Sequence, residues 1–464
     1  MRRFVEVDRA TQFLLPVDLR DWVPEDHIVH FIIEAVETIA PKLDFHVNER
    51  GCGSQQFAPE MMLELLIYSY STKRFSSYAI EKATYSDIPT MYITAMKHPD
   101  HNTINNFRKN NSKAFKKAFV QVLLLAQTTG LMKKLGTISV DGTKVHANAS
   151  KHKAVSYKYA KEQIEKYEKE VDELVKQADK IDNTENEVDL PEEIKIREER
   201  IKVLKEAVTQ IEEMQNEIYE HEKEEYDRKQ KEREEDEKKN GKKRGGKKPK
   251  EPENKVDDKA QVNFTDSESR IMKFGNSKNF EQSYNLQAAV EADSMLVVGT
   301  YPTQKGTDRQ ELKKAVESIP EELETEELVY AVADTGYFSG KIIEETEKEH
   351  PEVKVICATK REPHGKTVAD ILRVLPEKMS EENKETPMTT NKMQARLKTK
   401  EGQEIYAKRK TTVEPVFGII KRVMGFRQFL MRGLENIEIE WDLVTLSYNI
   451  NRMFNLKMAA IKAK

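Results

Sequence analysis

Three acidic residues stand where carboxylates can do chemistry together. Asp141 closes the β-rich run "GTISVD", Asp334 closes the apolar run "LVYAVAD", and Glu414 lies in "KRKTTVEPVFGIIKR" at the start of a predicted helix. Strand ends at one edge of a sheet lie close in space, and a helix packed on that edge can add a third acid. Crowded carboxylates raise one another's pKa, and a divalent cation removes that penalty. Two such ions would support in-line displacement at a phosphodiester.

Each acid also has an ordinary structural interpretation. Asp141 can form an Asx-turn with Gly142, and Asp334 can do the same before Gly336. Glu414 can favour the start of its helix through the helix macrodipole. Any one of these acids alone is more often structural than catalytic. All three together, in this order on this strand pattern, favour a catalytic site.

Basic and polar residues accompany the third acid. Residues 400–432 contain eight Lys or Arg against three Glu, in a chain whose formal net charge is −4. Lys421 follows Glu414 by seven residues, which is two turns along the same helix face. Tyr406 and Arg409 precede Glu414 and can hold a DNA backbone. One helix is therefore predicted to present both a metal-type carboxylate and a phosphate-type ammonium.

The elements that must position these acids follow an α/β order. Residues 134–150 supply the first strand, and residues 261–464 return to globular composition after an interruption. Over these two segments the pattern is strand, strand, strand, helix, strand, helix, strand, helix. That order predicts a mixed sheet flanked by helices.

Residues 151–260 interrupt this core and differ in composition. Apolar residues recur every three or four positions in two registers: Ile164, Tyr167, Val171, Leu174, Ala178 and Ile181, then Ile194, Ile201, Leu204, Val208, Ile211 and Ile218. Two heptad-like helices joined by a short break predict an inserted antiparallel coiled-coil hairpin. The stretch "KEEYDRKQKEREEDEKKNGKKRGGKKPKEPEN" follows with almost no apolar content, so we expect a flexible charged loop or a solvated helix end.

Residues 1–133 have the apolar periodicity of helices, as in "PEDHIVHFIIEAVETIA" and "APEMMLELLIYSYS". In "HNTINNFRKNN", Arg108 and Lys109 lie on a short predicted helix and can contact DNA in a helix-turn-helix manner. A solvated helix face is the alternative, and the sequence leaves both open. We expect an all-α N-terminal DNA-binding domain over this segment.

Length and composition bound the remaining possibilities. The 464 residues suit about two to four domains. Cys52 and Cys357 form no Cys-x-x-Cys pair, which fits a reducing compartment. We see no apolar stretch long enough to span a bilayer and no secretory signal core at the N-terminus. These features predict a soluble cytoplasmic protein.

Three motifs together carry a family resemblance. The segments "VDGTKVHANAS", "ADTGYFS" and "YAKRKTTVEPVFGIIKR" resemble those of bacterial insertion-sequence transposases of the DDE class, over nearly the whole chain. The resemblance implies a ribonuclease-H-like catalytic core, with Asp141, Asp334 and Glu414 as ligands of catalytic Mg²⁺ or Mn²⁺, in two ions. It also implies nicking at transposon ends and attack of the freed 3′-hydroxyl on target DNA.

The same resemblance implies partners and contacts. Double-stranded DNA from the transposon ends and the target would be bound by a homodimer or larger assembly on the nucleoid. The DNA contacts expected in the core are Tyr406, Arg409, Lys421, Thr143 and Lys144. Four residues separate Arg409 from Glu414, where a widely described version of the motif has three. Lys410 is therefore a rival for the role of Arg409.

Three functional hypotheses follow from these observations. The first is a DNA transposase, and the second is a metal-dependent nuclease that uses the same chemistry without strand joining. The third is a catalytically inactive DNA-binding or scaffold protein, against which the intact acidic triad speaks. The inserted hairpin can serve in dimerisation, in end binding or as a lever.

Overall fold

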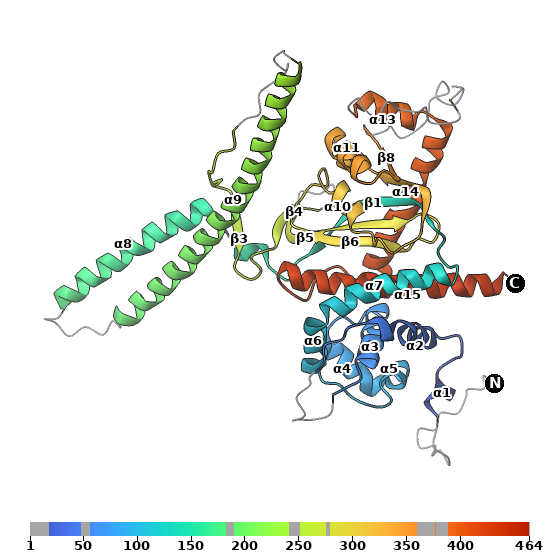
Figure 1. Cartoon of the computed structure of the whole chain (residues 1–464). Helices are drawn as coiled ribbons and strands as arrows, with labels where there is room; N and C mark the ends of the chain where they lie inside the picture. Colours follow the sequence, from blue (N-terminus) through green and yellow to red (C-terminus); the bar gives the residue numbers. More distant parts are fainter. Residues whose placement is uncertain are drawn as a thin grey trace, which may run out of the picture. The chain divides into compact units, whose positions relative to one another are not determined.

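The chain folds into two compact units. The computed structural model describes residues 18–47, 56–181, 190–240, 251–274, 279–359, 376 and 388–463. One unit comprises Met1–His146 together with Tyr284–Lys464, and the other comprises Ala147–Ser283. The predicted insertion, 151–260, lies inside the second unit. Figure 1 labels the helices and strands of both.

Helices fill the first part of the first unit. They are α1 (Leu19–Trp22), α2 (Ile28–Ile39), η1 (Ala40–Lys42), α3 (Pro59–Ser71), α4 (Ser77–Ser86), α5 (Ile88–Ile93), α6 (His101–Asn110) and α7 (Ser112–Thr128). The last helix of the chain, α15 (Leu434–Lys462), packs against α2, α3, α6 and α7 and also contacts β6 (Val297–Thr303) (Figure 1). Every side chain from Ile439 to Ile450 is buried, as expected for a helix enclosed by protein on all sides.

The sheet of the first unit is mixed, as the sequence predicts. Its strands are β1 (Leu135–His146), β5 (Phe280–Glu291), β6, β7 (Thr325–Ala333) and β8 (Val353–Cys357), in the order β5-β1-β7-β8 with β6 also paired to β5. β7 runs parallel to both β1 and β8, whereas β5 and β6 are antiparallel. Parallel strands are buried on both faces, which accounts for the apolar runs that precede the two aspartates.

Helices flank this sheet. They are α10 (Leu312–Glu317), the 3₁₀ turn η3 (Thr335–Tyr337), α11 (Gly340–Glu349), α13 (Thr390–Leu397), α14 (Lys400–Gly418) and the π-helical turn η4 (Ile419–Val423). α14 contacts β1, β7 and β8, so it crosses three neighbouring strands. α11 and α13 both contact β8, and α10 contacts β6. α14 is therefore the helix placed to bring side chains to the strands that carry the aspartates.

The first strand does not stop at Asp141, contrary to the sequence-based expectation. β7 pairs with β1 only as far as Val140, but the chain stays extended to His146. There His146 N–H donates to the Arg427 carbonyl (3.2 Å), and Phe429 N–H donates to the His146 carbonyl (2.9 Å). The other neighbour of β1 in the sheet is β5, and this isolated bridge adds a further partner at the last residue of the strand.

Glu414 does not lie at a helix start either. α14 begins at Lys400, where the Thr399 hydroxyl caps it by accepting the Gly402 N–H at 2.9 Å. Glu414 therefore lies in the last part of the helix, where the macrodipole would not favour a carboxylate. Lys421 lies in the π-helical turn that follows, so the two residues are not related by two regular α-turns. The predicted helix start failed because Thr399 supplies the cap far upstream of Glu414.

The second unit is built on two long helices, α8 (Tyr157–Ile181) and α9 (Leu190–Asn240), with short strands β2 (Ala154–Ser156), β3 (Gln261–Asn263) and β4 (Arg270–Lys273). β2 and β3 pair antiparallel, and β4 pairs antiparallel with the beginning of β5. Its buried core contains Val155, Ala160, Leu204, Ala207, Ile211 and Val262.

Ion pairs fix the direction of the two long helices. They join Lys161 to Glu212, Glu168 to Lys205 and Glu170 to Arg197. Positions that rise along α8 meet positions that fall along α9, so the two helices pack antiparallel. The charged stretch after residue 222 is helical as far as Asn240. Residues 241–250 lie outside the described part of the chain.

Across the described ranges, helices that combine the length and apolarity needed to cross a bilayer are absent.

Candidate active site

The pairing of β1 with β7 brings two of the predicted acids side by side. The last register pair of these parallel strands is Val140 with Ala333, and Asp141 and Asp334 are the next residues on each strand. Neighbouring strands lie about 4.8 Å apart. The two aspartates, 193 positions apart in the sequence, therefore emerge together at one edge of the sheet.

Each aspartate is held locally by a backbone hydrogen bond. Gly142 N–H donates to Asp141 Oδ1 at 2.8 Å, and Gly336 N–H donates to Asp334 Oδ1 at 2.7 Å. The second bond caps the 3₁₀ turn η3. The ordinary structural roles considered for these residues are thus real, but each bond engages only one oxygen of its carboxylate. Local capping and a role in a site are compatible.

Arg409 of α14 links the first acid to the third. Its Nη1 lies 3.7 Å from Asp141 Oδ2, and its Nη2 lies 3.3 Å from Glu414 Oε1. The Arg409 side chain is 12% exposed, that of Asp141 20% and that of Glu414 53%. The rival residue Lys410 is exposed on the next position. The geometry therefore favours Arg409 over Lys410 as the basic partner of the acids.

The electrostatics of Asp141 follow from this crowding. Burial, assisted by the charge of Asp334, raises the pKa of Asp141 from 3.8 to about 7, although the Gly142 N–H and Arg409 act to lower it. Burial works to lower the pKa of Arg409, but the neighbouring Tyr406 and the acids raise it overall. Burial also raises the pKa of Tyr406, against the effect of Arg409. The site holds more negative charge than its one guanidinium neutralises.

Lys421 is fastened to the strand that carries Asp141. Its Nζ donates to Thr143 Oγ1 and to the Lys144 carbonyl, both at 2.6 Å. Burial lowers the pKa of Lys421 to about 8. Thr143 and Lys144 follow Asp141 by two and three residues, and Lys421 binds to both. The three residues predicted to contact DNA therefore form one cluster.

The donor set fits a hard divalent cation in its chemistry. Asp141 and Asp334 present adjacent carboxylates, and burial first, then the charge of Asp334, raises the pKa of Asp141. A bound cation would favour the ionised form of both. Glu414 reaches the same group through Arg409. In the described ranges, no group of three or more His, Cys, Asp or Glu residues is gathered closely enough to hold an ion. Glu414 would have to leave Arg409 to become a third ligand.

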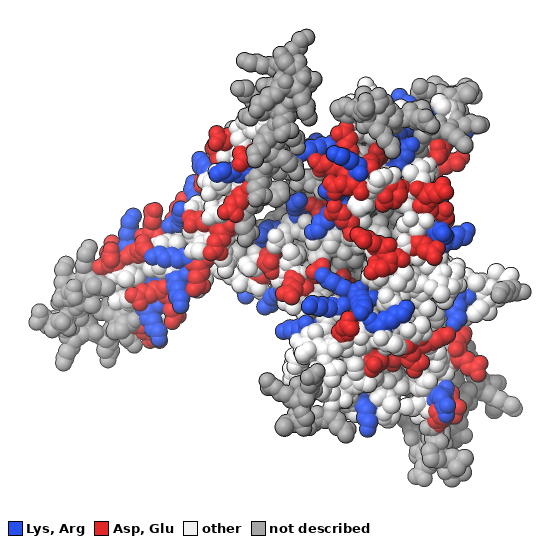
Figure 2. Space-filling model, in the orientation of Figure 1, with Lys and Arg blue, Asp and Glu red and all other residues white. Residues whose placement is uncertain are grey.

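The two DNA contacts predicted in the N-terminal helices, Arg108 and Lys109, differ in exposure. Arg108 is buried, at 3% exposed, and its Nη1 donates to Tyr70 Oη (3.1 Å) and to the Phe75 carbonyl (2.9 Å). Its guanidinium is used inside the helical domain, so we leave Arg108 out of the DNA contacts proposed below. Lys109 is exposed. On the face of the molecule in Figure 2, basic and acidic side chains are interspersed.

Sequence reasoning missed a polar cluster beside Asp141. Asp308 Oδ1 accepts hydrogen bonds from Asn285 Nδ2 and Gln287 Nε2, both at 2.7 Å. Gln287 in turn accepts a hydrogen bond from the hydroxyl of Tyr337, a residue of the "ADTGYFS" motif. Asp308 is the first residue of "DRQELKKAVESI", whose sequence predicts a helix but does not mark Asp308 as part of a site. Only the position of Tyr337 within the motif could have hinted at the cluster.

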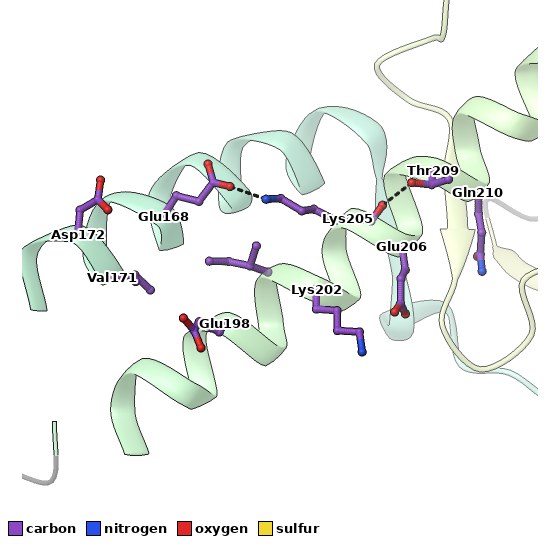
Figure 3. A pocket seen from close by; sticks show the side chains of 10 residues that line it. Glu168, Val171, Asp172, Glu198, Lys202, Lys205, Glu206, Thr209 and Gln210 are labelled. Carbon is purple, nitrogen blue, oxygen red and sulfur yellow. Dashed lines mark hydrogen bonds and ion pairs between the residues drawn. The ribbon is translucent and has the colours of Figure 1, made fainter. Parts of the chain in front are cut away.

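A groove of about 700 Å³ lies on the second unit, between α8 and α9. Figure 3 shows its lining, in which Val171 is flanked by charged side chains and Glu168 pairs with Lys205 at 2.7 Å. These are side chains of the helix–helix packing and its solvated rim. We assign no chemistry to the groove.

Two protein-family models match parts of the chain. A family model described as "Transposase DDE domain" matches residues 247–450, and one described as "Transposase domain (DUF772)" matches residues 17–110. The first range includes Asp334 and Glu414, and the second covers α1 to α6. Asp141 lies outside both ranges, so its assignment depends on the strand register. Neither the curated proteins nor the solved structures contain a match to the chain.

Proposed function

Because the chain belongs to the DDE transposases of insertion sequences, we propose that it cuts DNA at transposon ends and joins the freed 3′-hydroxyls to target DNA. The observation that carries this proposal is the register of β1 and β7, which brings Asp141 and Asp334 to one sheet edge. The link from Asp141 through Arg409 to Glu414 supports it further.

In this proposal Asp141, Asp334 and Glu414 hold Mg²⁺ or Mn²⁺, in two ions. The ions would activate the attacking oxygen and stabilise the leaving oxygen. The chain's own basic residues would hold the DNA phosphates in position. Arg409 has a planar fork suited to a phosphate, and Lys421 supplies a point charge beside Thr143.

The other contacts of this proposal come from the same edge and from the helical domain. Tyr406 lies beside Arg409, and Lys144 follows Thr143 on β1. Exposed Lys109 of α6 is the contact that we retain in the N-terminal helices. We propose that the partners are double-stranded transposon-end and target DNA, bound on the nucleoid by a homodimer or larger assembly. We further propose that α8 and α9 form a coiled coil that serves this assembly.

The test is cleavage of a supercoiled plasmid that carries the gene with its flanking DNA, in the presence of Mg²⁺. Native protein should cut at both flanks, and Asp334→Asn should lose more than about 100-fold in rate, the upper end for losing an outer-shell metal partner. Asp293→Asn is the matched control, because Asp293 is 66% exposed on a turn and pairs only loosely with Lys408 at 3.4 Å. Equal rates for native protein and Asp334→Asn would remove Asp334 from catalysis and overturn the proposal.

A second assay separates a transposase from a nuclease. Pre-cut ends with free 3′-hydroxyls are mixed with a supercoiled target plasmid, and joined products are counted. Joining that depends on Asp334 supports the transposase. Metal-dependent cutting without any joining would instead assign the nuclease function.

A further inference from the structure

Asp308 lies outside the three family motifs and is the centre of a hydrogen-bonded network. It lies in the connection between β6 and α10, and its Oδ1 accepts from Asn285 and Gln287. Asn285 and Gln287 are two residues apart on β5, so their side chains point to the same side of the sheet. Both are buried, at 1% and 0% exposed. β5 is the neighbour of β1 in the sheet, which brings the network next to the strand of Asp141.

The network touches the chain directly after Asp141. Gly142 has no side chain, and a Cβ there would lie 2.5 Å from Gln287 Nε2 and 2.6 Å from Asp308 Oδ1. Real Cβ atoms do not approach polar atoms this closely, so only glycine admits this packing. The network therefore fills the space beside Gly142, whose N–H holds Asp141 Oδ1.

The network also reaches the second acid. The Tyr337 hydroxyl donates to Gln287 Oε1, and the Tyr337 side chain is fully buried. Tyr337 ends the 3₁₀ turn η3, which Asp334 caps. Gln287 thus joins the turn that begins at Asp334 to the backbone that follows Asp141.

The network depends most on Asp308, because two buried amides donate to it. Asn285 and Gln287 are buried amides, and a buried donor left without an acceptor costs about 1–3 kcal/mol. A single oxygen, Asp308 Oδ1, accepts from both amides, so one side chain supplies the acceptor for the pair. A fully satisfied buried polar network rigidifies the residues around it. Removing the Asp308 oxygen takes one acceptor from each amide, while Asn285 Nδ2 keeps the Lys305 carbonyl at 3.1 Å and Gln287 Oε1 keeps the Tyr337 hydroxyl. The loss therefore loosens the packing against Gly142 and Tyr337.

We propose that Asp308 is a positioning residue for the acidic site: its acceptor oxygen, through Asn285 and Gln287, holds the backbone at Gly142 and the ring of Tyr337 so that Asp141 and Asp334 stay aligned. The inference rests on the proposed function, since it assigns what the aligned carboxylates are for. Asp308 is not assigned as a ligand. What it supplies is an oxygen in the right place, and its negative charge is secondary.

Two substitutions at one position separate these roles. Asp308→Asn keeps a carbonyl oxygen that can accept from both amides and removes the charge, whereas Asp308→Ala removes both. One readout is calorimetric titration of the DNA-free protein with Mn²⁺. The other is the rate of plasmid cutting as a function of Mn²⁺ concentration. Melting temperatures of all variants are measured alongside.

Asp308→Ala should weaken Mn²⁺ binding and raise the Mn²⁺ concentration for half-maximal cutting by about 10-fold or more, within the range for residues that orient ligands. Asp308→Asn should restore both to within about threefold of native, since it preserves the acceptor. If Asp308→Ala does not fold, Tyr337→Phe replaces it, because that variant removes only one hydroxyl from the far end of the network. It should shift the Mn²⁺ requirement in the same direction.

Two results would overturn the inference. One is an Asp308→Asn variant as impaired as Asp308→Ala, which would mean that the charge is needed. The other is unchanged Mn²⁺ binding and cutting in both Asp308→Ala and Tyr337→Phe. Failure of the proposed function looks different, because Asp334→Asn would then cut like the native protein whatever happens at Asp308. Asp293→Asn again serves as the unaffected acid.

Discussion

Replacing Asp141 by Asn should make the metal-free protein more stable at neutral and alkaline pH, although it should abolish activity. Burial and the neighbouring Asp334 raise the pKa of Asp141 from 3.8 to about 7. The ionised form is therefore disfavoured in the folded chain relative to the unfolded chain. Asn keeps the shape and can still accept the Gly142 N–H, but it carries no charge.

The sign and the pH window follow from linkage. Below about pH 4 the carboxyl is protonated in both folded and unfolded chains, so it contributes no difference. Between about pH 4 and pH 7 the unfolded chain releases a proton that the folded chain retains, so the free energy of unfolding falls as pH rises. Above about pH 7 the loss is complete. The advantage of Asp141→Asn should therefore grow from about pH 4 and level off above about pH 7.

The magnitude has a ceiling set by the pKa. A rise of about three in pKa, at about 1.4 kcal/mol for each, gives about 4 kcal/mol. The side chain is 20% exposed and Arg409 relaxes when the acid is removed, so we expect about half, or ~2 kcal/mol. For a unit of this size that corresponds to a rise of roughly 3–6 °C in melting temperature.

The assay is thermal unfolding of native protein and Asp141→Asn at intervals from pH 4 to pH 9, without divalent ions. Asp293→Asn is the control and should follow the native curve. Added Mg²⁺ at pH 8 should raise the melting temperature of the native protein but not that of Asp141→Asn. A native protein as stable as Asp141→Asn at pH 8, or a difference that does not vary with pH, would refute the electrostatic account of the site.

Three further predictions address the basic residues and the second unit. Arg409→Ala removes a positive charge from the side of Asp141, so it should tighten Mn²⁺ binding to the DNA-free protein several-fold while slowing DNA cutting by about 10-fold or more; weaker Mn²⁺ binding in calorimetry would contradict it. Lys421 has a pKa of about 8, so cutting by native protein should decline above about pH 8 as the ammonium is lost, and a pH–rate profile of Lys421→Arg should show no such decline, because Arg stays charged. Ile211→Ala opens a cavity in the buried core of the α8–α9 unit and should reduce its free energy of unfolding by about 2–5 kcal/mol in denaturant titration followed by circular dichroism, whereas exposed Val203→Ala should have little effect.

The parts of the site that the sequence predicts well are those that depend on strand patterning. Apolar runs ending in Asp141 and Asp334 predicted two buried strands whose ends lie at one edge of a sheet, because a buried parallel strand has a continuous apolar sequence. The pairing of Val140 with Ala333 agrees with that reasoning. Apolar residues spaced by three and four predicted the helices α8 and α9, and the short break between them predicted that they run antiparallel, as their ion pairs show.

Features that depend on tertiary partners were not predictable in this way. The cap at Thr399 moves the start of α14 far upstream of Glu414, and no local pattern near Glu414 indicates it. The burial of Arg108 depends on Tyr70 and Phe75, which are 38 and 33 residues away. Asp308 begins a stretch with helical spacing, although α10 starts only at Leu312, and its proximity to Asp141 depends on β5 and β1 being neighbours.

In the protein without DNA or metal, Arg409 is the basic partner of the acids, but it holds them only loosely. Arg409 pairs with Asp141 and Glu414 at 3.7 and 3.3 Å, longer than the 2.7–2.9 Å typical of strong charge-assisted hydrogen bonds, and its buried Nε has no partner in the described part of the chain. A guanidinium held this loosely can leave the acids at small cost when phosphate oxygens become available. The carboxylates then need another cation. In the proposed function, the burial and crowding that lower the stability of the metal-free protein would also favour the binding of a divalent ion.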